Sequence, residues 1–230
     1  MVALDELGAA ERELQGRAVE GGVARLGYFM SAGAVLVPRS LAALRRRSPD
    51  IKVTTREGAT PSLVRALRAH TIDLALLSSR IPYRPPDDLD PPLQLEALAE
   101  AQLLLAVPAD GRLGKRKTMH VDELADQRWI ASASRSDEPL LGVWPGMAGR
   151  PRLVHSARDW LSKLNLVAAG CGVTTVPALL AAIIPEGVRL IEVQGGPDER
   201  RRLVLARLPE PASLPSTELA ATLRHEAKGL

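Results

Sequence analysis

The chain has 230 residues, enough for one large domain or two smaller lobes, and 46% of them are hydrophobic. A formal net charge of +3 is too small to indicate a nucleic-acid surface by itself. The one cysteine, Cys171, excludes an internal disulfide, and no apolar stretch approaches the roughly 20 residues that span a bilayer. Because the first residues also lack the apolar core of a signal peptide, we expect a cytoplasmic protein.

The first segment is predicted to be helical over residues 3–18. Leu4, Leu7 and Leu14 fall near a heptad spacing, although Glu11 interrupts the stripe. So short a helix is not stable alone in water, and it needs a partner to persist. The two glycines at 21–22 end it.

Strands and helices alternate through the first half of the chain. Continuous apolar runs are typical of buried strands, and apolar residues at i, i+4 and i+7 favour helices. This order predicts a mainly parallel sheet with helices on both faces. Residues 80–92 contain five prolines and are expected to form a surface loop. The expected elements are strands at Val23–Phe29, Ile51–Arg56 and Ile72–Leu77 and helices at Gly33–Arg47 and Pro61–Ala69.

A second α/β set follows this loop. Apolar strands at 103–107 and 202–207 could carry the chain between two lobes, so we expect lobe I over residues 21–103 and 206–230 and lobe II over 104–205. A cleft between two such lobes is a preferred place for a small ligand. The other expected elements are strands at 129–132, 152–155, 173–176 and 188–193 and helices at 121–125, 159–169, 178–184 and 216–228.

The sequence shows no catalytic, metal or cofactor motif. The four histidines lack metal-ligand spacing. Ser31 is not in a nucleophile elbow, because Phe29 stands where the first glycine is required. The glycines at 170 and 172 follow a predicted helix and precede a strand, which indicates a helix C-cap rather than a dinucleotide site. Cys171 between them is either a small packed residue or a reactive thiol.

Hydroxyl side chains recur where predicted strands end and helices begin. Ser31 and Thr60 precede the first two helices, Ser79 ends the third strand, and Ser132 follows a strand of the second set. Such hydroxyls can cap helices and do nothing more. Alternatively, hydroxyls and free N–H groups that face one cleft form an anion pocket. The sequence leaves both interpretations open.

An ordered series of short motifs resembles the effector-binding domain of LysR-type transcriptional regulators over about residues 20–210. No single motif is specific, whereas the series in this order is. The motifs are Gly27-Tyr28-Phe29-Met30-Ser31, Leu36-Val37-Pro38-Arg39-Ser40-Leu41, Ser48-Pro49-Asp50-Ile51, Glu57-Gly58-Ala59-Thr60, Ile72-Asp73-Leu74-Ala75-Leu76, Leu103 to Pro108, Val121 to Asp126, and Leu166 to Pro177.

This resemblance implies an α/β fold of the periplasmic-binding-protein-like type II, in which two crossover strands join two lobes. It implies a small effector, often a carboxylate, held between the lobes, and no cofactor or enzyme activity. Ser31 and Thr60 match positions that commonly contact the effector, and Ser79, Ser132 and Thr174 match more loosely. The domain is expected to form a homodimer, and the full-length regulator a tetramer.

In the family, a winged helix-turn-helix domain and a linker helix come first, and only that domain contacts DNA. Residues 1–20 would be a remnant of the linker. His70 departs from the family, which usually has glycine at this helix end. Arg135 and the region of Trp144 are left open as pocket residues. The alternatives are a transport-type solute-binding protein of the same fold and an enzyme on this two-lobed fold, for which the sequence shows no acid-base pair.

Overall fold

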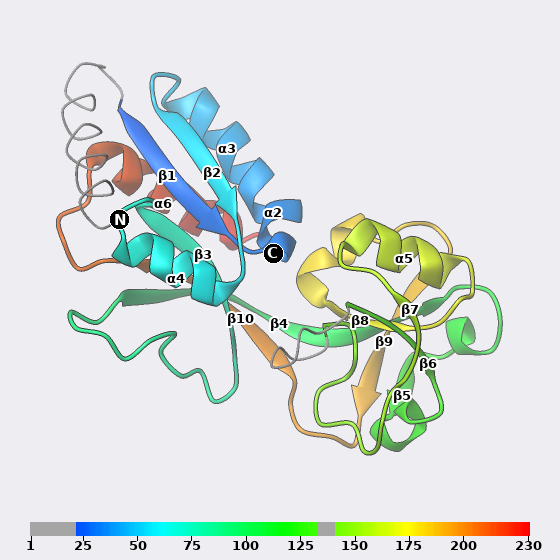
Figure 1. The fold of residues 1–230 in the computed structure, drawn as a ribbon. Helices are drawn as coiled ribbons and strands as arrows, with labels where there is room; N and C mark the ends of the chain where they lie inside the picture. The colour runs from blue at the N-terminus through cyan, green and yellow to red at the C-terminus, as the bar shows by residue number, and fades with distance from the viewer. Residues whose placement is uncertain (1–21, 133–140) are drawn as a thin grey trace. The chain divides into compact units, whose positions relative to one another are not determined.

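The computed structural model describes residues 22–132 and 141–230, so the helix predicted at 3–18 lies outside the described residues. The chain divides into two compact units (Figure 1). Unit 1 is Met1–Glu100 with Arg201–Leu230, and unit 2 is Ala101–Arg200. Both changes of unit fall inside strands, at Glu100 in β4 (Gln94–Pro108) and at Arg200 in β10 (Arg200–Arg207). This is the expected α/β class, two α/β units joined by two strands.

The sheet of unit 1 has β1 (Val23–Tyr28) between two parallel neighbours, β2 (Lys52–Glu57) and β3 (Leu74–Arg80). Strand β10 returns antiparallel to β3, so the expectation of a mainly parallel sheet holds for the first three strands only. The chain reaches β10 from unit 2, and it therefore enters the sheet from the opposite end.

Helices cover both faces of this sheet, as the alternation of strands and helices predicted. α3 (Leu36–Arg47) and α6 (Leu214–Ala227) pack on the face that carries Leu74 and Leu76 of β3. α4 (Thr60–Arg68) packs on the other face, against Ala75 and Leu77. Because alternate residues of a strand point to opposite faces, these two clusters show that α3 and α4 lie on opposite sides (Figure 1).

The single helix predicted at Gly33–Arg47 is wrong at its start. The helical chain begins at Met30 with the short α2 (Met30–Ala34) and is interrupted at Val35, where φ is −127° and ψ is −63°. The Tyr28 ring lies so close to Gly33 that a Cβ there would stand 2.4 Å from its Cε2 atom. The small residues of α2 therefore allow the helix to start immediately after β1 and under this ring.

α4 matches the predicted helix at Pro61–Ala69 to within one residue. His70 follows it with φ of 52°, the left-handed conformation that usually selects glycine. Its N–H donates to Leu67 O, and the Thr71 N–H donates to Ala66 O. The helix-ending turn is thus retained although histidine replaces the family's glycine.

Unit 2 is built on the second part of β4. This strand pairs antiparallel with β8 (Thr174–Pro177) and β9 (Val188–Gln194), and β9 pairs parallel with β5 (Thr118–His120). A separate parallel pair joins β6 (Arg128–Ala131) to β7 (Arg152–Ser156). The core between them is formed by large apolar side chains, among them Trp129, Trp144, Leu105 and Val173.

The helices of unit 2 are only partly as predicted. α5 (Trp160–Ala168) is confirmed, with Asp159 as its N-cap and Gly170 at φ of 74° after its end. The helices predicted at 121–125 and 178–184 are 3-10 helices, at Val121–Leu124 and Ala178–Ile183. A further 3-10 turn spans Leu113–Lys115. Such short 3-10 segments are common as connectors between longer elements.

An ion pair ties the start of β1 to the turn before β3. The Asp73 carboxylate accepts hydrogen bonds from the Arg25 backbone N–H at 2.7 Å and from its guanidinium, and Arg25 also donates to His70 O at 2.8 Å. Both side chains are less than one-third exposed. The pair therefore holds the end of α4 against the central strand of unit 1.

Replacing Asp73 with alanine should lower the free energy of unfolding by about 2 kcal/mol, because it removes charge-assisted hydrogen bonds and leaves a backbone N–H without its acceptor. Urea unfolding of Asp73→Ala measures this loss. Asp88→Ala, at an exposed aspartate of the same unit, is the matched control and should change stability by less than about 0.5 kcal/mol. Equal effects of the two substitutions would contradict the assigned role.

Candidate functional site

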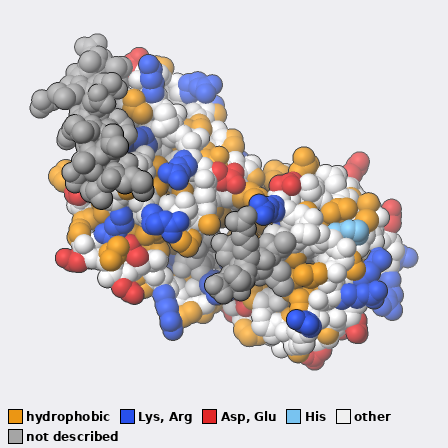
Figure 2. Space-filling model, in the orientation of Figure 1, with side chains coloured by type: hydrophobic (Ala, Val, Ile, Leu, Met, Phe, Trp, Pro, Cys, Tyr) orange, Lys and Arg blue, Asp and Glu red, His pale blue; other side chains and the backbone are white. Residues whose placement is uncertain are grey.

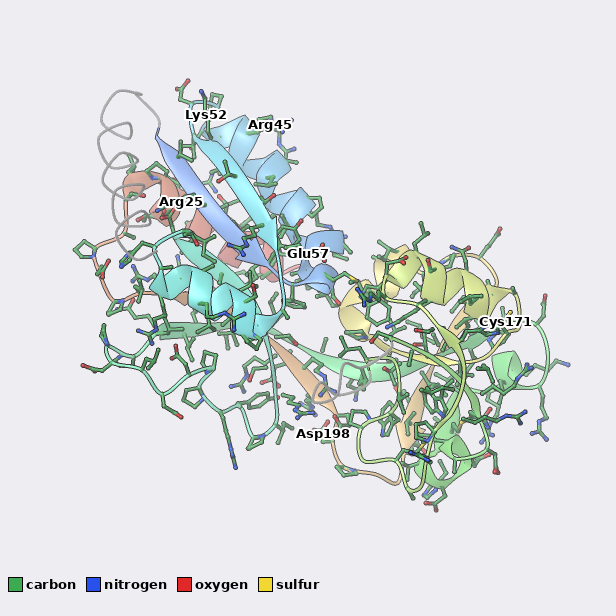
Figure 3. All side chains as sticks on the ribbon, viewed as in Figure 1. Arg25, Arg45, Lys52, Glu57, Cys171 and Asp198 are labelled. Atoms are coloured by element: carbon green, nitrogen blue, oxygen red, sulfur yellow. The ribbon has the colours of Figure 1, made fainter. Side chains whose placement is uncertain are left out.

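The edge of unit 1 where β1 and β2 end has the geometry of a ligand site. The two strands are parallel and end side by side, with Tyr28 paired to Glu57. The chain leaving β1 goes to the face of α3, and the chain leaving β2 goes to the face of α4. Connections that diverge to opposite faces leave a crevice at the carboxyl ends of the strands. Figure 3 labels Glu57 at this edge and Lys52 at the opposite end of β2.

Ser31 lies at this edge, but not as a helix cap. It was expected immediately before a helix, whereas it is the second residue of α2, whose N-cap is Phe29. The Phe29 carbonyl accepts from the N–H groups of Ala32 and Gly33 at 3.0 and 3.1 Å. Ser31 is only 5% exposed, so its hydroxyl belongs to the packed interior of the turn.

Thr60 lies at the same edge and is likewise not a cap. It is the first residue of α4, and Ala59 is the N-cap without a side-chain hydrogen bond. The N–H groups of Ser62 and Leu63 donate to Ala59 O, and Pro61 has no N–H. Within residues 22–132 and 141–230, neither the hydroxyl nor the backbone N–H of Thr60 has a recorded hydrogen-bond partner. A half-buried donor pair at a helix N-terminus is suited to an anion.

Ser79 lies at the end of its strand, as predicted. β3 continues to Arg80, and Ser79 pairs with Arg202 of β10. Since Gly27 of β1 is level with Ala75 of β3, Ser79 lies beyond the end of β1, at the same edge as Ser31. Three of the predicted residues are thus brought to one edge of unit 1. Glu57 is also at this edge, and because it is exposed, water screens its charge.

In unit 2, the other two predicted residues meet at the backbone of Leu141 and Gly142. Ser132 follows β6, and its N–H and Oγ both donate to Leu141 O, at 2.8 and 3.2 Å. Thr174 begins β8, and its Oγ1 donates to Gly142 O at 3.3 Å. A Cβ on Gly142 would lie 2.8 Å from Thr174 Oγ1, so only glycine allows this approach. The structure therefore brings Ser132 and Thr174 to adjacent residues.

Lys163 joins this group, although no motif in the sequence points to it. Its Nζ donates to Leu141 O at 2.9 Å, the same oxygen that Ser132 contacts, and lies 5.0 Å from the centre of the Trp160 ring. The residue is only 2% exposed. Lysine is almost never so buried unless it is paired. The sequence did contain one sign of this burial, because Lys163 lies four residues before Val167 and therefore on the apolar face of the predicted helix.

Burial lowers the pKa of Lys163 from 10.5 to about 8, and the Asp159 carboxylate raises it in part. Asp159 itself caps α5, since its two oxygens accept from the N–H and the hydroxyl of Ser162. These hydrogen bonds lower the pKa of the Asp159 carboxyl group. At neutral pH Lys163 is therefore a buried cation, and the carboxylate nearest to it along the helix is engaged elsewhere.

The other residues left open by the sequence have simpler placements. Trp144 is 4% exposed in the core of unit 2, and its Nε1 donor has no partner among the described residues. Cys171 is half-buried in the turn after α5 (Figure 3). Arg135 lies outside the described residues. In the part of the chain that the structure describes, no group of three or more His, Cys, Asp or Glu side chains could hold a metal ion, and no helix is long and apolar enough to cross a membrane.

Comparison with known proteins gives consistent matches. The sequence model of the family described as "LysR substrate binding domain" matches residues 17–228. The HTH-type transcriptional regulator TtuA of Agrobacterium vitis is 29% identical over 189 residues, which cover 80% of this chain and 60% of TtuA. The chain thus spans less than two-thirds of the length of this relative.

Solved structures show the same fold. The BenM effector binding domain with its effector benzoate has a TM-score of 0.68 and 22% identity, covering 90% of this chain and 92% of that chain. Full-length CbnR complexed with its target DNA has a TM-score of 0.70 and 20% identity, covering 98% of this chain and 78% of that chain.

Replacing Lys163 with methionine should stabilise the ligand-free protein. Below pH 8 the ammonium is charged in both the folded and the unfolded chain, so folding bears the full cost of burying it. Between pH 8 and 10.5 only the unfolded chain retains the proton, and wild-type stability rises. Leu141 O keeps both Ser132 donors in Lys163→Met.

We therefore expect the free energy of unfolding of Lys163→Met to exceed that of the wild type by about 3 kcal/mol at pH 7. This difference should shrink as the pH approaches 10.5. Urea unfolding at a series of pH values in ligand-free buffer measures both quantities. A variant less stable than wild type at pH 7 would show that the lysine contributes to stability.

Proposed function

Because this chain belongs to the LysR substrate binding domain family, we propose that it is the effector-sensing part of a transcription regulator and that its effector is a small anion. The observation that carries the proposal is the edge of unit 1. There the connections after β1 and β2 diverge to opposite faces, and the hydroxyl and N–H of Thr60 are both available within the described residues. Helix N–H groups and hydroxyl donors together favour a negatively charged ligand.

Five residues form the proposed effector contacts, as the family resemblance implied. Three belong to unit 1, Ser31, Thr60 and Ser79, and two to unit 2, Ser132 and Thr174. A protein similar in fold supports a carboxylate, since the BenM effector binding domain was solved with its effector benzoate. Two of the five already use their hydroxyls within unit 2, so Thr60 is the residue whose donor is most directly offered.

The rest of the regulator's activity is proposed from the relatives, which are transcription regulators. DNA would be bound by a winged helix-turn-helix domain outside residues 22–230, in the cytoplasm, and effector binding would change DNA binding or transcription. On the face drawn in Figure 2, Lys and Arg side chains lie in separate groups among apolar and acidic ones, not in one continuous basic stripe. The transport-type alternative finds no support among these relatives.

Thr60→Val should weaken binding of a carboxylate effector about 10- to 100-fold, because it removes one hydrogen bond to a charged group. The fold should persist, since Thr60 caps no helix. Calorimetry with the tightest-binding acid from a panel of small carboxylates measures the change. Thr55→Val, at an exposed threonine of β2, is the matched control and should bind like wild type. Equal affinity of Thr60→Val and wild type would place the effector elsewhere.

The isolated chain should form a homodimer at micromolar concentration, with α3 as one contact. The family resemblance implies the dimer, and small residues favour α3 as a contact. Of these residues Ala42 is exposed, whereas Ala43 is buried within unit 1. Sedimentation equilibrium measures the mass, and Ala42→Glu should weaken the dimer by placing a charge in the contact. A monomer at these concentrations would contradict the proposed assembly.

A further inference from the structure

The interior of unit 2 holds a lysine that is paired with no carboxylate among residues 22–132 and 141–230. Lys163 lies on the buried face of α5 beside Leu164 and Val167, and it is 2% exposed. Among the described residues its recorded partners are one carbonyl oxygen, Leu141 O, and the Trp160 ring. No carboxylate of the described chain lies within 4 Å of Nζ. An ammonium has three N–H donors and a full positive charge. These contacts use only some of the donors and balance only part of the charge.

A structural role does not explain this arrangement. Burying an unpaired charge is unfavourable, and an apolar side chain of similar volume would fill the space without that cost. The carbonyl does not require the lysine either, because Ser132 supplies two donors to Leu141 O. Asp159, one turn earlier on α5, already accepts from Ser162 with both oxygens. Within residues 22–132 and 141–230 this charge is compensated only in part, by Asp159 without a direct contact, and the arrangement therefore favours an anionic partner.

The Lys163 ammonium is held at a segment that reaches the surface of unit 2. Its hydrogen bond to Leu141 O is only partly buried, and Leu141 itself is 64% exposed. Ser132 is half-buried beside the same oxygen. Lys163 thus lies in the core of unit 2, and its ammonium and the Ser132 hydroxyl meet at one carbonyl oxygen of an exposed residue.

We propose that the Lys163 ammonium and the Ser132 hydroxyl bind a carboxylate of the effector in unit 2. This inference rests on the proposed function. It adds to the proposed effector site a cation, Lys163, that favours negatively charged effectors over neutral ones. The Ser132 hydroxyl can turn from Leu141 O to the ligand, because Leu141 O keeps the Ser132 N–H and Lys163 as donors. Two N–H groups of the ammonium remain for the carboxylate, and charge-assisted bonds of this kind are the strong ones.

A buried ammonium discriminates by charge. A carboxylate neutralises it, whereas the amide of the same shape leaves the buried charge unpaired and adds N–H donors where acceptors are needed. Wild-type protein should therefore bind a carboxylate at least about 10-fold more tightly than its amide.

The experiment measures binding of benzoate, malonate and inorganic phosphate at pH 7 by calorimetry, with benzamide and malonamide as neutral counterparts. Wild type is compared with Lys163→Met and Lys163→Gln, and Lys117→Met at an exposed lysine of unit 2 is the matched control. We expect wild type and Lys117→Met to bind a carboxylate and not its amide. Lys163→Met and Lys163→Gln should bind that carboxylate about 10- to 100-fold more weakly.

The outcomes separate this inference from the proposed function. A carboxylate that loses affinity in Thr60→Val but not in either Lys163 variant overturns the role of Lys163 and leaves the effector-sensing function standing. Tighter binding of the amides, or of phosphate alone, also overturns a carboxylate at Lys163. If neither acids nor amides bind to wild type, the inference fails and the proposed function loses its support as well.

Discussion

The central position of β1 between two parallel neighbours is the constraint on which unit 1 depends. It forces the chain to leave β1 and β2 at the same edge, and the packing of α3 and α4 on opposite faces separates the two connections. The Gly27 backbone lets this packing be close, because a Cβ there would lie 2.6 Å from Ile72 and 2.8 Å from Leu63. The donors of Thr60 follow from this geometry and not from any catalytic motif.

Unit 2 depends on a different feature, one carbonyl oxygen shared by three donors. Leu141 O accepts from the Ser132 backbone, the Ser132 hydroxyl and Lys163, while the neighbouring Gly142 O accepts from Thr174 and Thr175. These bonds fix β6, α5 and β8 to one short segment. This segment does not need a charged donor, because the Ser132 N–H and hydroxyl already donate to Leu141 O. We expect this buried cation to lower the stability of the ligand-free protein, a balance that ligand-binding sites commonly show.

Strong apolar periodicity made much of this fold predictable from sequence, and an ordered series of family motifs identified the family. α4, α5, β1 and β3 were found because each buries one clear face or run. The first part of β4 was missed because its Leu, Glu and Ala residues favour helices, and its strand form comes from pairing partners distant in sequence. Lys163 was missed because a lysine on a helix is ordinarily solvated, and only packing shows this one buried. The sequence left open whether Ser31 and Thr60 cap helices, and the helix starts at Met30 and Thr60 exclude that interpretation for both.

The claim that polar groups at strand ends hold the effector is tested most directly by hydrogen exchange, measured by mass spectrometry with and without a saturating small carboxylate. The account predicts slower exchange in three short segments, residues 29–31 and 58–60 of unit 1 and residues 141–143 of unit 2, because ligand contacts there protect amides near the surface. The Thr60 amide, which has no recorded acceptor within the described residues, should change most. Unchanged exchange in all three segments, with protection elsewhere in the chain, would contradict the account.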